Sequence, residues 1–177
     1  HLKKLIKKKY KENNKVEIMG DDILKFNLNK FENLIIFSNL PYNLSAKIIL
    51  YLFKFNNNIT EMIFMIQKEV SEKFDYKLPK MNKYKFLTYI VSKYERCFDV
   101  SNKVFSPIPK VKSTVVKFKF YKRKIDLNKA YNFSNLIFKN VRKKINNNLK
   151  LNIENNLLKK RVNELSIDDL LSIYNLF

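Results

Sequence analysis

The chain has 177 residues, of which 46% are hydrophobic and 14% aromatic, and its 36 lysine and arginine residues against 16 acidic ones give a formal net charge of +20. This length and apolar content suffice for one buried core and a small appendage, which excludes a disordered chain. The charge favours a polyanionic partner, above all nucleic acid, although an AT-rich coding sequence would also raise the lysine content.

Cysteine and histidine are nearly absent. Cys97 is the single cysteine and His1 the single histidine, so the sequence offers no disulfide framework, no cysteine or histidine metal site and no Ser-His-Asp triad. No apolar run reaches membrane-spanning length and no signal peptide is recognisable, so we expect an intracellular protein without metal or membrane partners. The chain opens without methionine inside a helical pattern, and we expect it to be truncated at its N-terminus.

The first elements are a helix and a short strand. Residues 1–13 predict a helix with lysines on its solvated side and one apolar face, formed by Leu2, Leu5, Ile6 and Tyr10. Residues 16–19 predict a strand, followed by Asp22. A carboxylate at a strand end suits an amino group or ribose hydroxyl of a nucleotide-like cofactor, but Asp22 is equally suited to a turn or a helix cap.

The chain is organised around the segment from Leu34 to Tyr42. The unbroken apolar run 34–37 predicts a strand buried on both faces of a parallel sheet, and it stops at Asn39-Leu40-Pro41-Tyr42. Ligands of open α/β sheets bind at the carboxyl ends of strands. Pro41 lacks an N–H donor and holds Leu40 out of helical geometry, which we expect to leave the Leu40 carbonyl free to point into a pocket.

This tetrapeptide has the groups needed to hold an amine. The side-chain oxygen of Asn39 and the carbonyl of Leu40 could accept both hydrogens of one exocyclic amine, while Tyr42 offers a ring face to a flat base. An amine held in this way has its lone pair turned out of conjugation and toward an electrophile. The plain alternative is a strand that ends in an ordinary proline turn.

The elements that follow alternate between helix and strand. We expect a helix over 45–55 capped by Ser45, a strand over 61–67, helices over 68–73 and 83–91, and strands over 94–100 and 115–121. Between the last two strands, Pro107 and Pro109 stiffen a loop and are expected to expose Phe105 near its start.

From about Asp126 the strand signals stop and helical periodicity continues to the C-terminus. Ser166 and Asp169 form a capping box before the last helix, expected over 167–177. Three basic residues near the first of these helices are either a patch for a phosphate backbone or a solvated face: Arg142, Lys143 and Lys144.

Five blocks of the sequence, in order, resemble those of the rRNA adenine dimethyltransferases: NLPYNLSAKIIL, FMIQKEVSEKF, VFSPIPKVKSTVVKF, FKNVRKKINNNL and RVNELSIDDLLSIYNL. The resemblance extends from about Val16 to the C-terminus. It implies an α/β fold with a Rossmann-like S-adenosylmethionine-dependent methyltransferase sheet, its first strands missing. It divides the chain into a partial catalytic domain at 1–124 and a helical RNA-docking domain at 125–177.

The activity implied by this resemblance is dimethylation of two adjacent adenosines near the 3′ end of small-subunit rRNA, during ribosome biogenesis. The cofactor would be S-adenosylmethionine, and the partner of the monomeric enzyme would be the rRNA of the pre-ribosomal small subunit. Asn39 and the Leu40 carbonyl, followed by Pro41, would hold the target amine. Tyr42 and Phe105 would stack on the two sides of the flipped adenine.

The cofactor residues implied by the resemblance are Asp22, which would bond the adenine amino group, Ile23 beside it, and Asn39 at the methionine end. The implied RNA-binding residues are Arg142, Lys143 and Lys144. The family's glycine-rich loop and the acidic residue that closes its second strand are missing from these residues, whose only glycine is Gly20. Either the chain is a truncated enzyme or catalysis has been lost.

The alternative to an enzyme is a non-catalytic RNA-binding factor of the same descent, acting in ribosome assembly or in organellar transcription. Retention of the Asn39–Tyr42 motif and Phe105 favours the enzyme, because a binding-only protein needs no amine clamp. The macrolide-resistance enzymes, which methylate one large-subunit adenosine, fit the later blocks less well. The compartment stays open between cytoplasm, nucleolus and an organelle with its own ribosomes.

Overall fold

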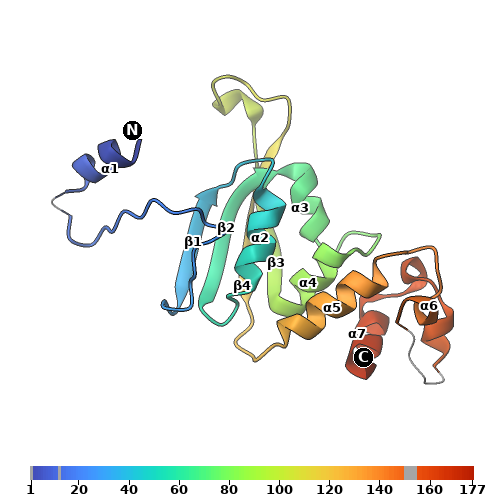
Figure 1. Cartoon of the computed structure of the whole chain (residues 1–177). Coiled ribbons are helices and arrows are strands. Elements are labelled where there is room, and N and C mark those ends of the chain that lie inside the picture. Colours follow the sequence, from blue (N-terminus) through green and yellow to red (C-terminus); the bar gives the residue numbers. More distant parts are fainter. Residues whose placement is uncertain (1, 12, 150–154) are drawn as a thin grey trace.

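A four-stranded mixed sheet with strand order β1-β2-β4-β3 is the centre of the computed structural model, which describes residues 2–11, 13–149 and 155–177 (Figure 1). β1 (Leu34–Asn39) runs parallel to β2 (Ile59–Gln67), whereas β4 (Ser113–Phe120) runs antiparallel to both β2 and β3 (Ser92–Val100). The carboxyl ends of β1, β2 and β3 therefore lie at the same edge of the sheet as the start of β4.

Helices come before, between and after the strands of the sheet. They are α1 (Leu2–Lys9), α2 (Ser45–Phe53), α3 (Lys68–Phe74), α4 (Lys83–Val91), α5 (Leu127–Ile137), α6 (Ile145–Leu149) and α7 (Ile167–Leu176), with 3-10 turns at Asn102–Val104, Asn156–Lys159 and Val162–Glu164. Figure 1 shows α2 in front of the sheet, where the ring of Phe53 meets that of Phe118 in β4 edge-on at 5.8 Å.

One hydrophobic core joins the sheet to the C-terminal helices. The ring of Phe86 in α4 lies 5.1 Å from that of Phe133 in α5 and 5.7 Å from that of Tyr174 in α7. The expected capping box is confirmed, because Ser166 Oγ accepts the Asp169 N–H and the Asp169 carboxylate accepts the Ser166 N–H. Among the described residues after Asp126 the structure has helices and 3-10 turns and no strand of the sheet, as expected.

The prediction that β1 is buried on both faces is wrong. Ile35 and Phe37 are 55% and 69% exposed, while Leu34 and Ile36 are half-buried on the other face. In the described residues β1 is an edge strand, and nothing covers the face that carries Ile35 and Phe37. An apolar run cannot show by itself whether both faces of its strand are covered.

The strand expected over 16–19 is not formed either. These residues belong to no helix and no ladder, and Val16 and Met19 are exposed. A strand needs a hydrogen-bonding neighbour, and β1, at the edge of the sheet, has only β2 beside it in the described part of the chain.

The other predicted elements are present with small shifts at their ends. α1 ends at Lys9 instead of residue 13, and the first residue of that expected helix, His1, lies outside the described residues, as does the side chain of Leu2. α2 ends at Phe53 instead of residue 55. Ser45 is not its cap, because it is the first helical residue and its hydroxyl donates to the Tyr42 carbonyl at 3.1 Å.

Candidate active site

The motif Asn39-Leu40-Pro41-Tyr42 lies at the carboxyl edge of the sheet. Asn39 is the last residue of β1 and pairs with Met65 of β2. The Leu40 N–H donates to the Met65 carbonyl at 3.1 Å, so the parallel ladder continues one residue past β1, and Leu40 is buried at 5% exposure. β2 therefore fixes the backbone from which the two predicted acceptors project.

The turn after Leu40 leads directly into α2. The Leu44 N–H donates to the Pro41 carbonyl at 3.0 Å, and Ser45 Oγ donates to the Tyr42 carbonyl. Among the described residues, no donor forms a hydrogen bond with the Asn39 side chain or the Leu40 carbonyl. Asn39 is also exposed. The two acceptors proposed for an amine are therefore unengaged.

Tyr42 is half-buried and its hydroxyl lies 2.8 Å from Ser113 Oγ. Ser113 is fully buried and begins β4, where it pairs with Gln67 of β2 and Val100 of β3. The contact therefore holds the Tyr42 ring against the ends of three strands. Ser113 was not predicted as a site residue, because a contact across 71 residues of sequence leaves no local signal.

The loop with Phe105 rises from the same edge, between β3 and β4, and Figure 1 shows it above the sheet. Asn102 Nδ2 donates to the Pro109 carbonyl at 3.3 Å and the Phe105 N–H donates to the Asn102 carbonyl at 3.3 Å. This turn draws Phe105 back into a half-buried position, so the prediction that Phe105 is exposed is wrong. Val104 and Ile108 are the exposed apolar residues of the loop, at 70% and 65%.

An ion pair lies near the C-terminal end of β3, where the Phe105 loop begins. The guanidinium of Arg96 bonds the carboxylate of Asp99, and this hydrogen bond lowers the pKa of Asp99. Thr114 Oγ1 donates to the Phe98 carbonyl at 3.0 Å. These contacts fix the strand end from which the Phe105 loop departs.

Asp22 and Ile23 lie in a turn rather than at a strand end, since residues 16–19 form no strand. Asp22 is exposed and its Oδ1 accepts the Leu24 N–H at 3.0 Å, while Ile23 is half-buried against the core. Asp22 lines a hollow of about 400 Å³ together with Lys47 and other residues of α2. None of residues 39–42 or Phe105 lines this hollow, so the structure does not bring the two predicted groups of residues into one pocket.

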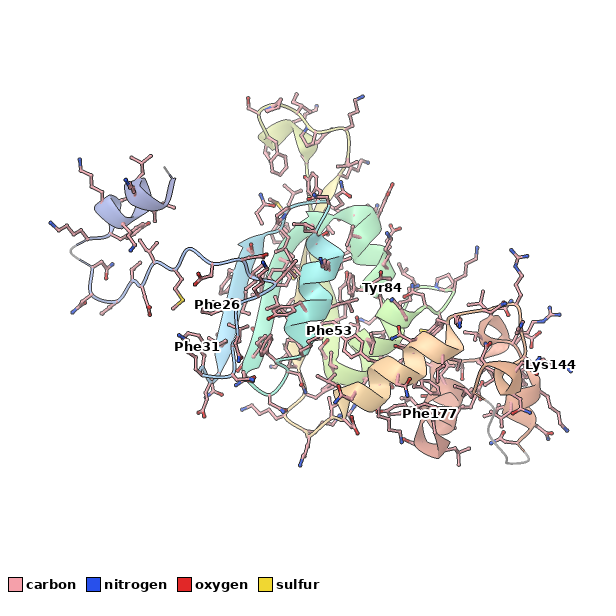
Figure 2. The ribbon with its side chains drawn as sticks, viewed as in Figure 1. Phe26, Phe31, Phe53, Tyr84, Lys144 and Phe177 are labelled. Carbon is pink, nitrogen blue, oxygen red and sulfur yellow. The ribbon has the colours of Figure 1, made fainter. Side chains whose placement is uncertain are left out.

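The basic patch Arg142-Lys143-Lys144 is exposed in the loop between α5 and α6. Asn148 Nδ2 donates to the Asn140 carbonyl at 3.1 Å and to the Ile137 carbonyl at 3.3 Å, which fixes that loop. Figure 2 shows Lys144 at the end of the molecule opposite to Phe31, far from the Phe105 loop. The patch is therefore separate from the residues at the sheet edge.

A family model described as ribosomal RNA adenine dimethylase matches residues 1–177. The chain belongs to the ribosomal RNA adenine dimethylase family. It is 39% identical to the ribosomal RNA small subunit methyltransferase A of Buchnera aphidicola subsp. Baizongia pistaciae, over 94% of this chain and 66% of that protein. It is 35% identical to the protein of the same name from Hydrogenobaculum sp., over 97% of this chain and 67% of the relative.

This member of the dimethylase family spans about two thirds or less of several curated relatives, down to 56% of the one from Malacoplasma penetrans. Two solved structures share its fold. A dimethyladenosine transferase from Plasmodium falciparum superposes with a TM-score of 0.73 at 19% identity, over 97% of this chain and 77% of that one. The 23S rRNA methyltransferase ErmE superposes with a TM-score of 0.69 at 16% identity, over 98% of this chain and 77% of that one.

The expected fold class is thereby confirmed, because both structural neighbours have the S-adenosylmethionine-dependent methyltransferase fold. The resemblance stated from the sequence blocks is confirmed by the family match. Within residues 2–11, 13–149 and 155–177, no helix is long and apolar enough to cross a membrane, and no cluster of three or more His, Cys, Asp and Glu side chains is arranged around a metal site.

Three side chains have the chemistry that parts of S-adenosylmethionine would require, although Ile23 and Asn39 do not line the hollow beside Asp22. The Asp22 carboxylate, with one oxygen used by Leu24, still has acceptor capacity for an adenine amino group. The unengaged Asn39 amide, at the sheet edge, has an acceptor for the ammonium of the methionine moiety. Ile23 supplies apolar surface next to Asp22.

Proposed function

We propose that this chain contains the target-base site and the RNA-docking region of an rRNA adenine dimethyltransferase. The reaction is transfer of methyl groups from S-adenosylmethionine to the exocyclic amines of adjacent adenosines near the 3′ end of small-subunit rRNA. The observation that carries the proposal is the pair of unengaged acceptors on Asn39 and Leu40 beside the Tyr42 ring that Ser113 fixes. A protein that only binds RNA needs no such pair.

The target adenine must leave its stack to reach this edge, which costs a few kcal/mol. Stacking on Tyr42 and Phe105 would offset that cost, at about 1–3 kcal/mol per base. The Asn39 oxygen and the Leu40 carbonyl then accept the two amine hydrogens. This turns the nitrogen lone pair out of conjugation with the adenine ring. When bound, S-adenosylmethionine supplies an electrophilic methyl group on its sulfonium.

Positioning carries most of the acceleration in this scheme. The amine nitrogen is neutral and nucleophilic once its lone pair is out of conjugation, so no base has to remove a proton before attack. The surplus proton leaves afterwards to water, and a second round at the same site gives the dimethylated base. In the second round the amine has one hydrogen left, and the Asn39 oxygen or the Leu40 carbonyl accepts it.

The RNA partner that we propose is the small-subunit rRNA, within the pre-ribosomal small subunit. The names of the relatives support it, and the exposed Arg142-Lys143-Lys144 patch suits a phosphate backbone. We also propose the division into a catalytic part at 1–124 and an RNA-docking part at 125–177, a monomeric state, and action inside the cell wherever ribosomes are assembled.

A transfer assay tests the proposal. The polypeptide from the complete reading frame is titrated with S-adenosylmethionine by calorimetry and then incubated with unmethylated small ribosomal subunits and cofactor labelled in the methyl group. We expect one cofactor site and label in RNA that depends on Asn39. Tight RNA binding with neither cofactor binding nor label would contradict the proposal and favour a binding-only factor.

A further inference from the structure

The crossover from β4 to α5 lies at the sheet edge opposite to the Asn39–Tyr42 motif, below the sheet in Figure 1. Two hollows of about 610 and 510 Å³ meet there, and both are lined by Tyr121, Arg123 and Lys124. We name this double hollow the crossover groove. It has no part in the base-binding chemistry described above, because no residue of the motif lines it.

The crossover groove is basic. Lys122, Arg123 and Lys124 are consecutive and exposed. The acidic residue in its lining is Asp126, and that carboxylate is occupied as the N-cap of α5, accepting the Lys129 N–H at 2.9 Å. The groove therefore presents three cations to an anionic ligand with little local compensation.

Arg123 is already held in a shape suited to recognition. Its guanidinium lies 4.8 Å from the centroid of the Tyr121 ring, and Nη2 donates to the Ile90 carbonyl at 3.3 Å. Stacking and the hydrogen bond together fix a planar fork that has five N–H donors in total. Little side-chain entropy is then lost when the remaining donors meet a phosphate.

Fixed aromatic and apolar faces line the rest of the larger hollow. Tyr89 is held by an edge contact with Tyr76 at 5.1 Å, and Tyr174 by the Lys129 ammonium at 4.9 Å from its ring centroid. Flat rings and a guanidinium plane beside phosphate-binding cations are the combination by which proteins bind unpaired nucleotides. An acidic peptide would use the cations but not the ring faces.

We propose that the crossover groove binds a single-stranded segment of RNA, as a contact independent of the target adenosine. The inference rests on the proposed function, in which RNA is the substrate. The bases would lie against Tyr89, Tyr121 and Tyr174, and the phosphates against Lys122, Arg123 and Lys124. This contact raises affinity for the substrate and takes no part in methyl transfer.

The test compares two triple variants that lose the same charge. The groove variant is Lys122→Ala, Arg123→Ala and Lys124→Ala, and the control replaces Lys7, Lys8 and Lys9, exposed on α1, by Ala. Affinity for RNA from the 3′ region of the small subunit is measured by fluorescence anisotropy at several salt concentrations. We expect the RNA affinity of the groove variant to fall about tenfold or more and the slope of its salt dependence to fall by about 2. The RNA affinity of the control should stay within about twofold of wild type.

Two further measurements keep the test decisive if the triple variant folds poorly. Arg123→Lys keeps the charge but loses the planar fork and its bond to the Ile90 carbonyl. We expect at least a threefold loss of RNA affinity in a protein that still unfolds in one cooperative transition. The Michaelis constant for RNA should rise in the full reading-frame enzyme while kcat stays unchanged. Groove variants that match the control, or that fall in kcat alone, would overturn the inference.

Competition distinguishes the sources of the ligand. Adenosine monophosphate and a polyglutamate peptide are each added against the labelled RNA. Displacement of the RNA by adenosine monophosphate at a concentration equal to the Kd of the RNA would overturn the proposal of an RNA strand. So would binding of the peptide that is lost in the groove variant while the RNA affinity of that variant is unchanged. Wild-type protein that binds no RNA would instead contradict the proposed function, whereas a failure confined to the groove variants leaves that function standing.

Discussion

The hydroxyl oxygens of Tyr42 and Ser113 lie 2.8 Å apart and join the loop after β1 to the first residue of β4. Ser113 is fully buried, so the Tyr42 hydroxyl has a fixed partner rather than a mobile water. Rotation of the Tyr42 ring is thereby restricted. The ring that we propose to stack on the target base is positioned before RNA arrives.

Removing this hydrogen bond should lower both stability and methyl transfer. Ser113→Ala and Tyr42→Phe each delete one hydroxyl, and we expect each to reduce the free energy of unfolding by about 0.5–1.5 kcal/mol. Because both remove the same contact, their effects on kcat should not add in the double variant. Ser106→Ala, an exposed serine in the neighbouring loop, is the control. Additive effects would show that the two hydroxyls act separately.

Loss of the amide acceptor should separate binding from turnover. We expect Asn39→Ala to reduce kcat by at least about a hundredfold, because hydrogen bonds aimed at the reacting group are commonly worth that much. RNA affinity should stay within a few-fold of wild type, as the phosphate contacts are elsewhere. Ser38→Ala, the exposed neighbour, serves as control. A large loss of affinity with normal kcat would refute the assigned role.

The basic patch makes a prediction about salt. Replacing Arg142, Lys143 and Lys144 by Ala should weaken RNA binding and make it less dependent on salt concentration. If all three contact phosphates of a single strand, the slope of log affinity against log salt concentration should fall by about 2. Filter binding between low and physiological salt measures both quantities. An unchanged slope would show that these side chains are merely solvated.

Lys85 should contribute to stability although it lies far from the chemistry. It is 4% exposed, and its ammonium donates to the carbonyls of Leu78, Pro79 and Lys80 at 3.0, 2.7 and 3.3 Å. Lys85→Met keeps the apolar stem and removes the donors, so we expect a loss of about 1.5–3 kcal/mol in urea unfolding. Lys77→Met, at an exposed position, should change little.

The capping box of α7 should make the stability of the protein depend on pH in the acidic range. The backbone N–H of Ser166 donates to the Asp169 carboxylate, and this hydrogen bond lowers the pKa of Asp169. The stabilisation is therefore complete above the unfolded pKa of about 4 and is lost as the pH falls through the lower folded value. Asp169→Asn should flatten the decline of the melting temperature below pH 4. An unaltered profile would show that Asp169 does not contribute.

Much of this architecture could be predicted from local patterns. The apolar run of β2 and the alternation of apolar and basic residues in β4 depend on residues close in sequence. The bounds of these strands and of α3 and α4 shift by two residues or fewer from expectation. The end of β1 could be predicted as a candidate site because an apolar run stops there before Asn39. Topology then places that end beside the Phe105 loop.

The errors concern features that depend on distant partners. Whether the face of β1 with Phe37 is covered, and whether residues 16–19 find a strand to pair with, are settled by tertiary structure. Likewise, the partner of Tyr42 is 71 residues away. The roles of Asp22 and Phe105 at the bound ligands stay predictions, because they need the ligands themselves to be tested.

The most direct test of the central claim is mass spectrometry of small-subunit rRNA. Unmethylated small subunits are incubated with S-adenosylmethionine and the polypeptide from the complete reading frame, and the 3′ fragment is then sequenced. Our account predicts two adjacent N6,N6-dimethyladenosines with the wild type and unmodified adenosines with Asn39→Ala. Unmodified adenosines with a wild-type protein that binds both RNA and cofactor would contradict it.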